Sequence, residues 1–256
     1  MDYVLPKDAR NMRGLRVSLT AGVPAPWSEA AKAMFKLKGL DYVPVLQVIG
    51  DDNKELADWT GHRNAPTAMY EDEPPRVSWL DILNLAERLE PEPSLFPDAI
   101  GDRVTMVGLV NEIAGENGML WNARHLMFHG MVEAMGEEAA QKNPMIRDYR
   151  YSAEGAAAAT HRIIAILEQL ATALGANTAS NYFFGERVSA LDLYWACFSQ
   201  ILSVLPEEVN PMPDGARQVW GSISASLAAD GYTTDSSLLA HRDFIFQEHI
   251  GLPLEF

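Results

Sequence analysis

The chain has 256 residues, 48% of them apolar, which is enough to bury one large core or two modest ones. Its formal net charge of −15 repels phosphate backbones and anionic lipids, so we expect neither a nucleic-acid partner nor a membrane partner. The single cysteine, Cys197, excludes an intramolecular disulfide and a thiolate metal cage. The first twenty residues lack an apolar signal segment and no apolar run reaches the length of a bilayer span, so we expect a cytoplasmic protein.

The front half is predicted to alternate strands and helices. Residues 1–14 are polar and are interpreted as an N-terminal arm. Residues 15–19 alternate apolar and polar side chains, which predicts a half-buried strand, and a helix follows from Trp27 to a glycine cap at Gly39. Further elements are predicted as strands at 42–49 and 67–70, a short edge strand at 76–77, and helices at 54–59 and 78–89. Residues 15–90 therefore form one α/β domain.

The back half shows only helical periodicity. Proline-rich residues 91–99 break the preceding helix and form the predicted linker. Beyond it, helical patterns cover 100–136, 153–174, 190–205 and 213–228. We therefore expect an all-helical domain over residues 100–256.

This order of elements resembles that of the cytosolic glutathione S-transferases, in which a thioredoxin-like domain precedes an all-helical domain. Residues 64–67, Asn-Ala-Pro-Thr, resemble the family segment in which a cis-proline precedes the third strand. Ser78 lies where a family serine binds the γ-glutamyl carboxylate at a helix N-terminus, a favourable place for an anion. Val77 stands where the family has an acidic residue.

A third segment, residues 185–192, resembles the N-capping box of the family's helical domain. Ser189 is expected to cap the helix while Asp192 reaches back to the N–H of the cap residue. This motif concerns folding and not catalysis. The His241-Arg242-Asp243-Phe244 segment and the residue 252–256 tail resemble those of a little-characterised bacterial branch of the family.

The resemblance implies glutathione as cosubstrate and a small hydrophobic electrophile as the second substrate. Because the chain is acidic, local cations must attract the anionic tripeptide, and Lys32, Arg63 and Arg76 are the candidates. The residues implied to bind glutathione are Ala65, Pro66, Val77, Ser78, Trp27 and Arg63. Trp27 also lies on the apolar stripe of its helix. The residues implied to line the electrophile pocket are Trp121, Arg124 and Phe128.

The catalytic group is expected between residues 20 and 28. A free thiol has a pKa near 8.5, and a hydroxyl donor or a helix N-terminus stabilises its thiolate. Residues 25–28, Ala-Pro-Trp-Ser, resemble the Cys-Pro-aromatic motif of the cysteine-using classes, with Ala25 in place of the cysteine, and no tyrosine ends the first strand. The candidates are Thr20, which is also a good strand former, and Ser28, which also suits a helix cap. Backbone N–H groups of residues 24–28 are the alternative.

Two functions follow from these residues. The first is a detoxifying glutathione transferase, and the alternative is a non-catalytic scaffold or ligand-binding protein of the same fold. The resemblance also implies a homodimer. His125, His129 and Glu133 share one helix face at metal-ligand spacing, but a solvated face is the preferred interpretation, so we expect no metal. Cys197 lies within an apolar stripe and is interpreted as a buried hydrophobe.

Overall fold

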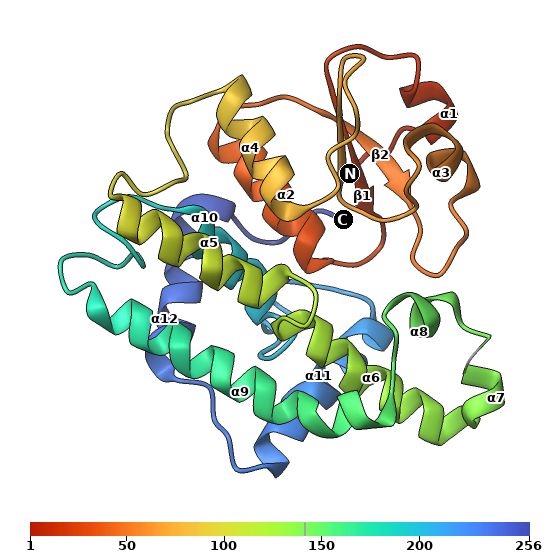
Figure 1. Cartoon of the computed structure of the whole chain (residues 1–256), viewed down its shortest axis with the longest axis vertical. Coiled ribbons are helices and arrows are strands. Elements are labelled where there is room, and N and C mark those ends of the chain that lie inside the picture. Colours follow the sequence, from red (N-terminus) through yellow and green to blue (C-terminus); the bar gives the residue numbers. More distant parts are fainter. Residues whose placement is uncertain (141) are drawn as a thin grey trace.

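The computed structural model of the chain describes residues 1–140 and 142–256. A small sheet with its helices forms the upper part of the molecule in Figure 1, and the remaining helices form the lower part. The sheet has the order β2-β1-β3, with β1 (Leu15–Thr20) in the centre. It is parallel to β2 (Val43–Gln47) and antiparallel to β3 (Thr67–Tyr70). The predicted fold class, a thioredoxin-like domain followed by an all-helical domain, is confirmed.

Helices cover both faces of the sheet. On one face α2 (Pro26–Leu37) packs against α4 (Trp79–Leu89) over the apolar side chains of β1. The opposite face carries α1 (Pro6–Ala9) and α3 (Lys54–Thr60) around a smaller apolar cluster. The prediction of a half-buried first strand was therefore wrong, since every residue of β1 is buried. Two of its polar side chains form hydrogen bonds within the domain. Arg16 donates through Nη1 and Nη2 to three backbone carbonyls, and the Ser18 hydroxyl bonds the Asn64 carbonyl and the Thr67 N–H.

The N-terminal segment is more than an arm. Val4 forms a parallel bridge with Val45, and α1 contacts α3, so the segment extends the sheet and covers its second face. The expected edge strand at 76–77 is reduced to one antiparallel bridge, in which Arg76 and Ala68 exchange both backbone hydrogen bonds. Residues 91–99 contain neither helix nor strand.

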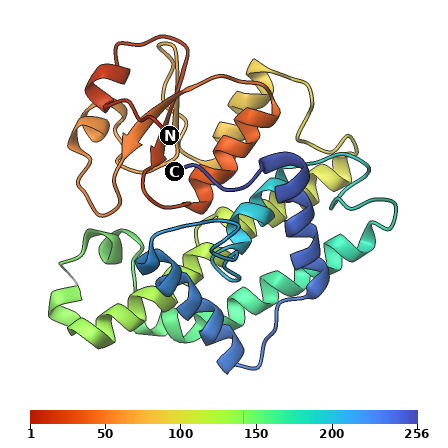
Figure 2. The same cartoon turned by 180° about the vertical axis from the view of Figure 1, so that it is seen from behind.

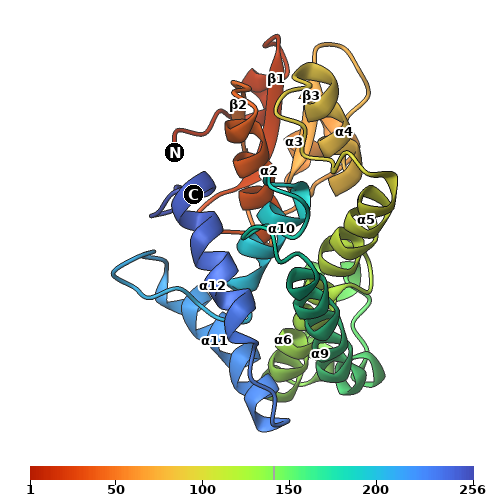
Figure 3. The same cartoon turned by 90° about the vertical axis from the view of Figure 1, so that its left-hand side faces the viewer.

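The helical half is built from long helices that Figures 1 and 3 show running beneath the sheet domain. They are α5 (Ile100–Ala114), α6 (Met119–Met135), α9 (Ala153–Ala176), α10 (Ala190–Ser199), α11 (Asp214–Ala229) and α12 (Ser236–Ile245). Shorter pieces are α7 (Glu137–Ala140), α8 (Pro144–Asp148) and the π-helical turn η1 (Phe246–Ile250). Helix α10 is buried along its whole length and packs against α2, α5 and α12, so it joins the two halves. It ends at Ser199, six residues before the predicted end at 205.

The single helix predicted over 100–136 is two helices. The chain turns sharply between α5 and α6, and the N–H of Gly118 donates to the C=O of Gly115. A Cβ on Gly115 would lie 2.6 Å from the Asn111 carbonyl oxygen, and one on Gly118 would lie 2.7 Å from the Glu112 carbonyl oxygen. Only glycine fits such close backbone approaches. Residues 115–118, Gly-Glu-Asn-Gly, are the turn signal that the prediction of a single helix passed over.

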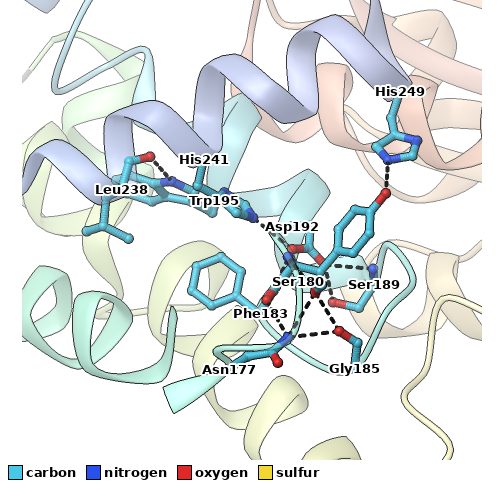
Figure 4. Close-up of polar contacts among 11 residues, drawn as sticks. Asn177, Ser180, Phe183, Gly185, Ser189, Asp192, Trp195, Leu238, His241 and His249 are labelled. Atoms are coloured by element: carbon cyan, nitrogen blue, oxygen red, sulfur yellow. Dashed lines mark hydrogen bonds and ion pairs between the residues drawn. The ribbon is translucent and has the colours of Figure 1, made fainter. Parts of the chain in front are cut away.

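The N-capping box at the start of α10 is present as predicted. Asp192 is fully buried and accepts from the Ser189 N–H at 2.7 Å and from the Ser189 hydroxyl at 2.6 Å. Its second oxygen accepts from the Phe183 N–H at 2.9 Å and lies 2.8 Å from His241 Nε2 on α12 (Figure 4). Trp195 Nε1 donates to the Leu238 carbonyl, a second bond between α10 and α12. The box therefore also anchors the C-terminal helix.

The C-terminal tail returns to the sheet domain, and Figures 2 and 3 place both chain ends on the same side of the molecule. Lys36 on α2 donates to the Ile250 carbonyl at 2.7 Å, and Lys32 donates to the Glu255 carbonyl. Cys197 is fully buried in α10, and burial raises the pKa of its thiol well above the ordinary value. It is a core residue, as interpreted from the sequence.

Candidate functional site

A cavity of about 470 Å³ lies between the two halves and takes lining residues from both. The front-half wall includes Thr20, Ala25, Trp27, Gln47, Arg63, Ala65, Pro66, Val77 and Ser78. The helical wall includes Asn111, Trp121, Arg124, Asp148, Tyr149 and Tyr194. Most of the predicted site residues are therefore brought to one cavity, although they come from segments far apart in the sequence.

The Ala65–Pro66 segment forms part of the front wall, and its peptide bond is cis. Ser18 on β1 holds this segment, because its hydroxyl donates to the Asn64 carbonyl at 3.2 Å and accepts from the Thr67 N–H at 2.9 Å. Within the described residues, the backbone N–H and C=O of Ala65 form no hydrogen bond. These two groups remain available to pair with an extended ligand at the cavity wall.

Ser78 caps α4 at the same wall. Its hydroxyl accepts from the Asp81 N–H at 3.1 Å and donates to the Asp81 carboxylate at 2.6 Å, so Ser78 is the N-cap of α4, and Asp81 bonds the cap hydroxyl and not the cap N–H. The N-terminus of α4 therefore faces the cavity beside Val77, with helix N–H groups that have no intrahelical partner. Such a helix end favours a carboxylate.

The segment expected to hold the catalytic group is largely engaged in the protein's own structure. Ser28 is buried outside the cavity lining, and its hydroxyl oxygen accepts from the Thr20 N–H at 3.1 Å. Ser28 is therefore placed as a structural partner of β1. The Thr20 hydroxyl reaches the cavity but donates to Gln47 Oε1 at 2.9 Å.

Backbone groups at the start of α2 are the remaining donors in this segment. Pro26 occupies the first turn, and the first intrahelical bond runs from the Glu29 N–H to the Ala25 carbonyl. The N–H groups of Trp27 and Ser28 are thereby left without helical partners, beside the cavity position of Ala25. That these N–H groups stabilise a thiolate stays a prediction.

The three basic candidates have different surroundings. Arg63 lines the cavity and forms ion pairs with Asp148 on α8 and with Asp52. Lys32 pairs with Glu29 at 2.7 Å, and Arg76 pairs with Glu73 at 2.9 Å. Neither Lys32 nor Arg76 lines the cavity, so attraction of an anion to its front wall falls to Arg63 and the helix N-termini.

The helical wall is aromatic and carries one further cation. Arg124 lies 4.3 Å from the ring centroid of Tyr149 and 5.3 Å from that of Trp27, and the Trp121 and Tyr149 rings are 4.8 Å apart. Trp27 is itself fixed by a 2.9 Å hydrogen bond from its indole N–H to the Ala114 carbonyl. Phe128 does not line the cavity, because it is buried beneath this wall against Ala140 and Ile146.

Sequence reasoning assigned no role to Gln47 and Tyr194. Gln47 ends β2 directly beside Thr20 in the parallel register, and the order of strands is the signal that could have found it. Tyr194 reaches the cavity from α10, where it was indistinguishable from the surrounding apolar stripe. Tyr149, which follows α8, is a further ring of the helical wall.

One histidine of α6, His129, contacts two neighbouring side chains. His129 Nδ1 lies 2.8 Å from the Tyr151 hydroxyl, and His129 Nε2 lies 3.6 Å from Glu133. Across residues 1–140 and 142–256, no cluster of three or more His, Cys, Asp or Glu side chains is arranged to hold a metal ion. In the same part of the chain, no helix combines the length and the apolar character needed to cross a bilayer.

Sequence comparison finds no matching family model and no matching curated protein. Comparison with solved structures is informative. A glutathione S-transferase of Methylobacterium radiotolerans, in complex with glutathione sulfonate, superposes with a TM-score of 0.58 at 16% identity and covers 94% of this chain and 97% of its own.

Two further structures agree. A glutathione S-transferase of Methylobacillus flagellatus with bound glutathione has a TM-score of 0.57 at 13% identity, covering 89% of this chain and 98% of its own. The Tau class enzyme of mango, Mangifera indica, has a TM-score of 0.53 at 17% identity, covering 90% and 92%. Since the similarity spans nearly the whole of each chain and includes both halves, this protein has the fold of the glutathione S-transferases.

Proposed function

We propose that this chain is a glutathione transferase that joins the glutathione thiolate to a small electrophile. One observation carries the proposal: a single cavity combines the cis Ala65–Pro66 segment, the Ser78-capped start of α4 and the start of α2 on one wall with aromatic side chains on the other. The front wall supplies backbone pairing groups and a carboxylate site for a peptide. The aromatic wall supplies apolar surface for the second substrate.

The chemistry requires a stabilised thiolate. We assign that role to the N–H groups of Trp27 and Ser28 at the start of α2, with the Thr20 hydroxyl as a further donor if it leaves Gln47. The thiolate sulfur attacks the electrophilic carbon, a carbon–sulfur bond forms, and the leaving group departs or the adjacent atom takes a proton. The thiol proton is released to solvent.

Calorimetric titration with millimolar glutathione tests the site. We expect binding to the wild type and about tenfold weaker binding to Ser78→Ala, because the Ser78 hydroxyl, which donates to Asp81 in the free protein, is then missing as a donor to the ligand carboxylate. Ser152→Ala is the matched control, since Ser152 caps α9 through the Gly155 N–H and lies outside the cavity lining. Both variants lose one helix cap, but only Ser78→Ala should lose affinity. Failure of the wild type to bind glutathione would refute the proposal.

A second function has a specific observation in its favour. Both hydroxyls of the expected catalytic segment are engaged within the protein, and Ala25 replaces the cysteine of the motif it resembles. A non-catalytic glutathione-binding protein of this fold is therefore the alternative. It would bind glutathione in the same titration yet leave both a chlorinated nitroaromatic and a panel of epoxides unconjugated, whereas the transferase converts at least one of them.

We also propose that the protein is a cytoplasmic homodimer that acts in detoxification. The start of α5 presents Ile100 and Val104 to solvent with 75% and 66% of their surface exposed, which is unusual for large apolar side chains at adjacent turns. Light scattering should give twice the chain mass, and Val104→Glu should shift it toward the monomer. A monomeric wild type would contradict the dimer while leaving the transferase proposal intact.

A further inference from the structure

Among the described residues, one cavity cation, Arg124, has no ion-pair partner. Arg124 on α6 forms no hydrogen bond and no ion pair with any of the described residues, and its Nε is buried without a partner. Loss of hydration lowers the pKa of its guanidinium. Buried arginines are ordinarily paired, because removing an unpaired charge from water is strongly unfavourable.

Two of the three carboxylates that line the cavity are paired with other arginines. Asp148 pairs with Arg63, and Glu116 forms an ion pair with Arg150 at 3.4 Å. Asp51, on the opposite wall, accepts from the Asn53 N–H at 2.8 Å. Within the part of the chain that the structure describes, Arg124 therefore lines the cavity without a carboxylate partner and can pair with an anionic ligand.

Aromatic rings hold the guanidinium in place without satisfying it. Its central carbon lies 4.3 Å from the Tyr149 centroid and 5.3 Å from the Trp27 centroid. Cation–π contacts attract a guanidinium but leave its N–H donors open. The site therefore offers a fork of donors at the edge of flat aromatic surfaces, which suits the carboxylate of a planar conjugated molecule.

The position of Arg124 separates this anion site from the proposed glutathione groups. Ala65, Ser78 and the start of α2 lie on the front wall, whereas Arg124 lies on the helical wall with Trp121 and Tyr149. Its contact with Trp27, two residues after Ala25, brings it next to the position assigned to the sulfur. We propose that Arg124 receives an anionic group of the electrophile, so that the enzyme selects aromatic or conjugated electrophiles that carry a carboxylate. This inference rests on the proposed transferase function.

Two matched electrophiles test the selectivity: para-chloro-meta-nitrobenzoate and its uncharged benzamide. In both, the thiolate displaces chloride, so a carbon–sulfur bond replaces the carbon–chlorine bond and the thiol proton goes to solvent. We expect Arg124→Gln to lower kcat/KM for the benzoate at least about tenfold and for the benzamide less than about twofold. Arg124→Lys, which keeps the charge, should retain part of the preference. Arg187→Gln is the control, because the Arg187 side chain is 55% exposed at its ion pair with Asp98 and neither residue lines the cavity.

The outcomes separate this inference from the function on which it rests. Equal losses for both electrophiles would mean that Arg124 serves glutathione or the fold, and no loss for either electrophile would mean that it serves neither substrate; either result overturns the inference. If the wild type converts neither compound, the transferase function is contradicted for these two electrophiles. The anion site at Arg124 is then tested by calorimetric binding of the same two compounds. Benzoate binding that is at least about tenfold tighter than benzamide binding, and lost in Arg124→Gln, supports the anion site. Equal binding of the two compounds refutes it.

Discussion

Replacing Asp192 by alanine should destabilise the protein more than loss of an ordinary helix cap. The carboxylate accepts from two buried backbone N–H groups, those of Ser189 and Phe183, and also bonds the Ser189 hydroxyl and His241 (Figure 4). A buried donor that loses its acceptor costs about 1–3 kcal/mol. The two backbone donors alone therefore give about 4 kcal/mol, a large share of the roughly 5–15 kcal/mol that stabilises a typical domain.

Urea unfolding and calorimetry measure this loss. At about 2–4 °C per kcal/mol for a chain of this size, the melting temperature should fall by about 10 °C. Asp98→Ala is the control, because the Asp98 side chain is 85% exposed at its ion pair with Arg187 and should contribute less than about 1 kcal/mol. Asp192→Asn keeps the shape and one acceptor oxygen, so its loss should lie between those of the two alanine variants. The reasoning is refuted if Asp192→Ala and Asp98→Ala unfold at the same urea concentration.

Three further predictions concern α2. Burial raises the pKa of Glu29 from 4.5 to about 7. Between these two pH values the folded protein retains a proton that the unfolded chain releases. The free energy of unfolding should therefore fall by about 3 kcal/mol as pH rises from 4.5 to 7. Glu29→Gln should remove that component in urea titrations across the range, and a pH-independent difference from wild type would contradict it. Ser28→Ala should lower stability by about 1–2 kcal/mol through loss of the Thr20 N–H acceptor while leaving kcat nearly unchanged; a stable variant that loses activity would instead make Ser28 catalytic. Ala25→Cys should place a thiol of lowered pKa at a helix start facing the cavity, so its thiolate attacks glutathione disulfide, forms a mixed disulfide and releases glutathione. Intact mass spectrometry should show one added glutathionyl group in the variant. The wild type should lack this group, because its only cysteine is the buried Cys197.

Strands, helices and helix caps could be predicted from the sequence alone, because they depend on residues that are close together in the chain. The strands at β2 and β3 and the helix α3 follow from local periodicity and turn residues. The capping box Ser189–Asp192 was predictable because both partners lie within one helical turn. The order of strands and helices, together with the three segments that resemble those of the family, predicted the two-part fold.

The contacts that a side chain makes with residues far away in the chain could be seen only in the folded structure. The Ser28 hydroxyl is taken by β1, Phe128 is covered by α7 and α8, and Asp192 also binds His241, 49 positions later in the chain. Periodicity indicates that a helix face is buried but not which element buries it. For the same reason, a basic residue in the sequence gave no sign of its charge partner. Whether Arg124 faces a carboxylate or an open cavity depends on helices that converge only in the folded protein.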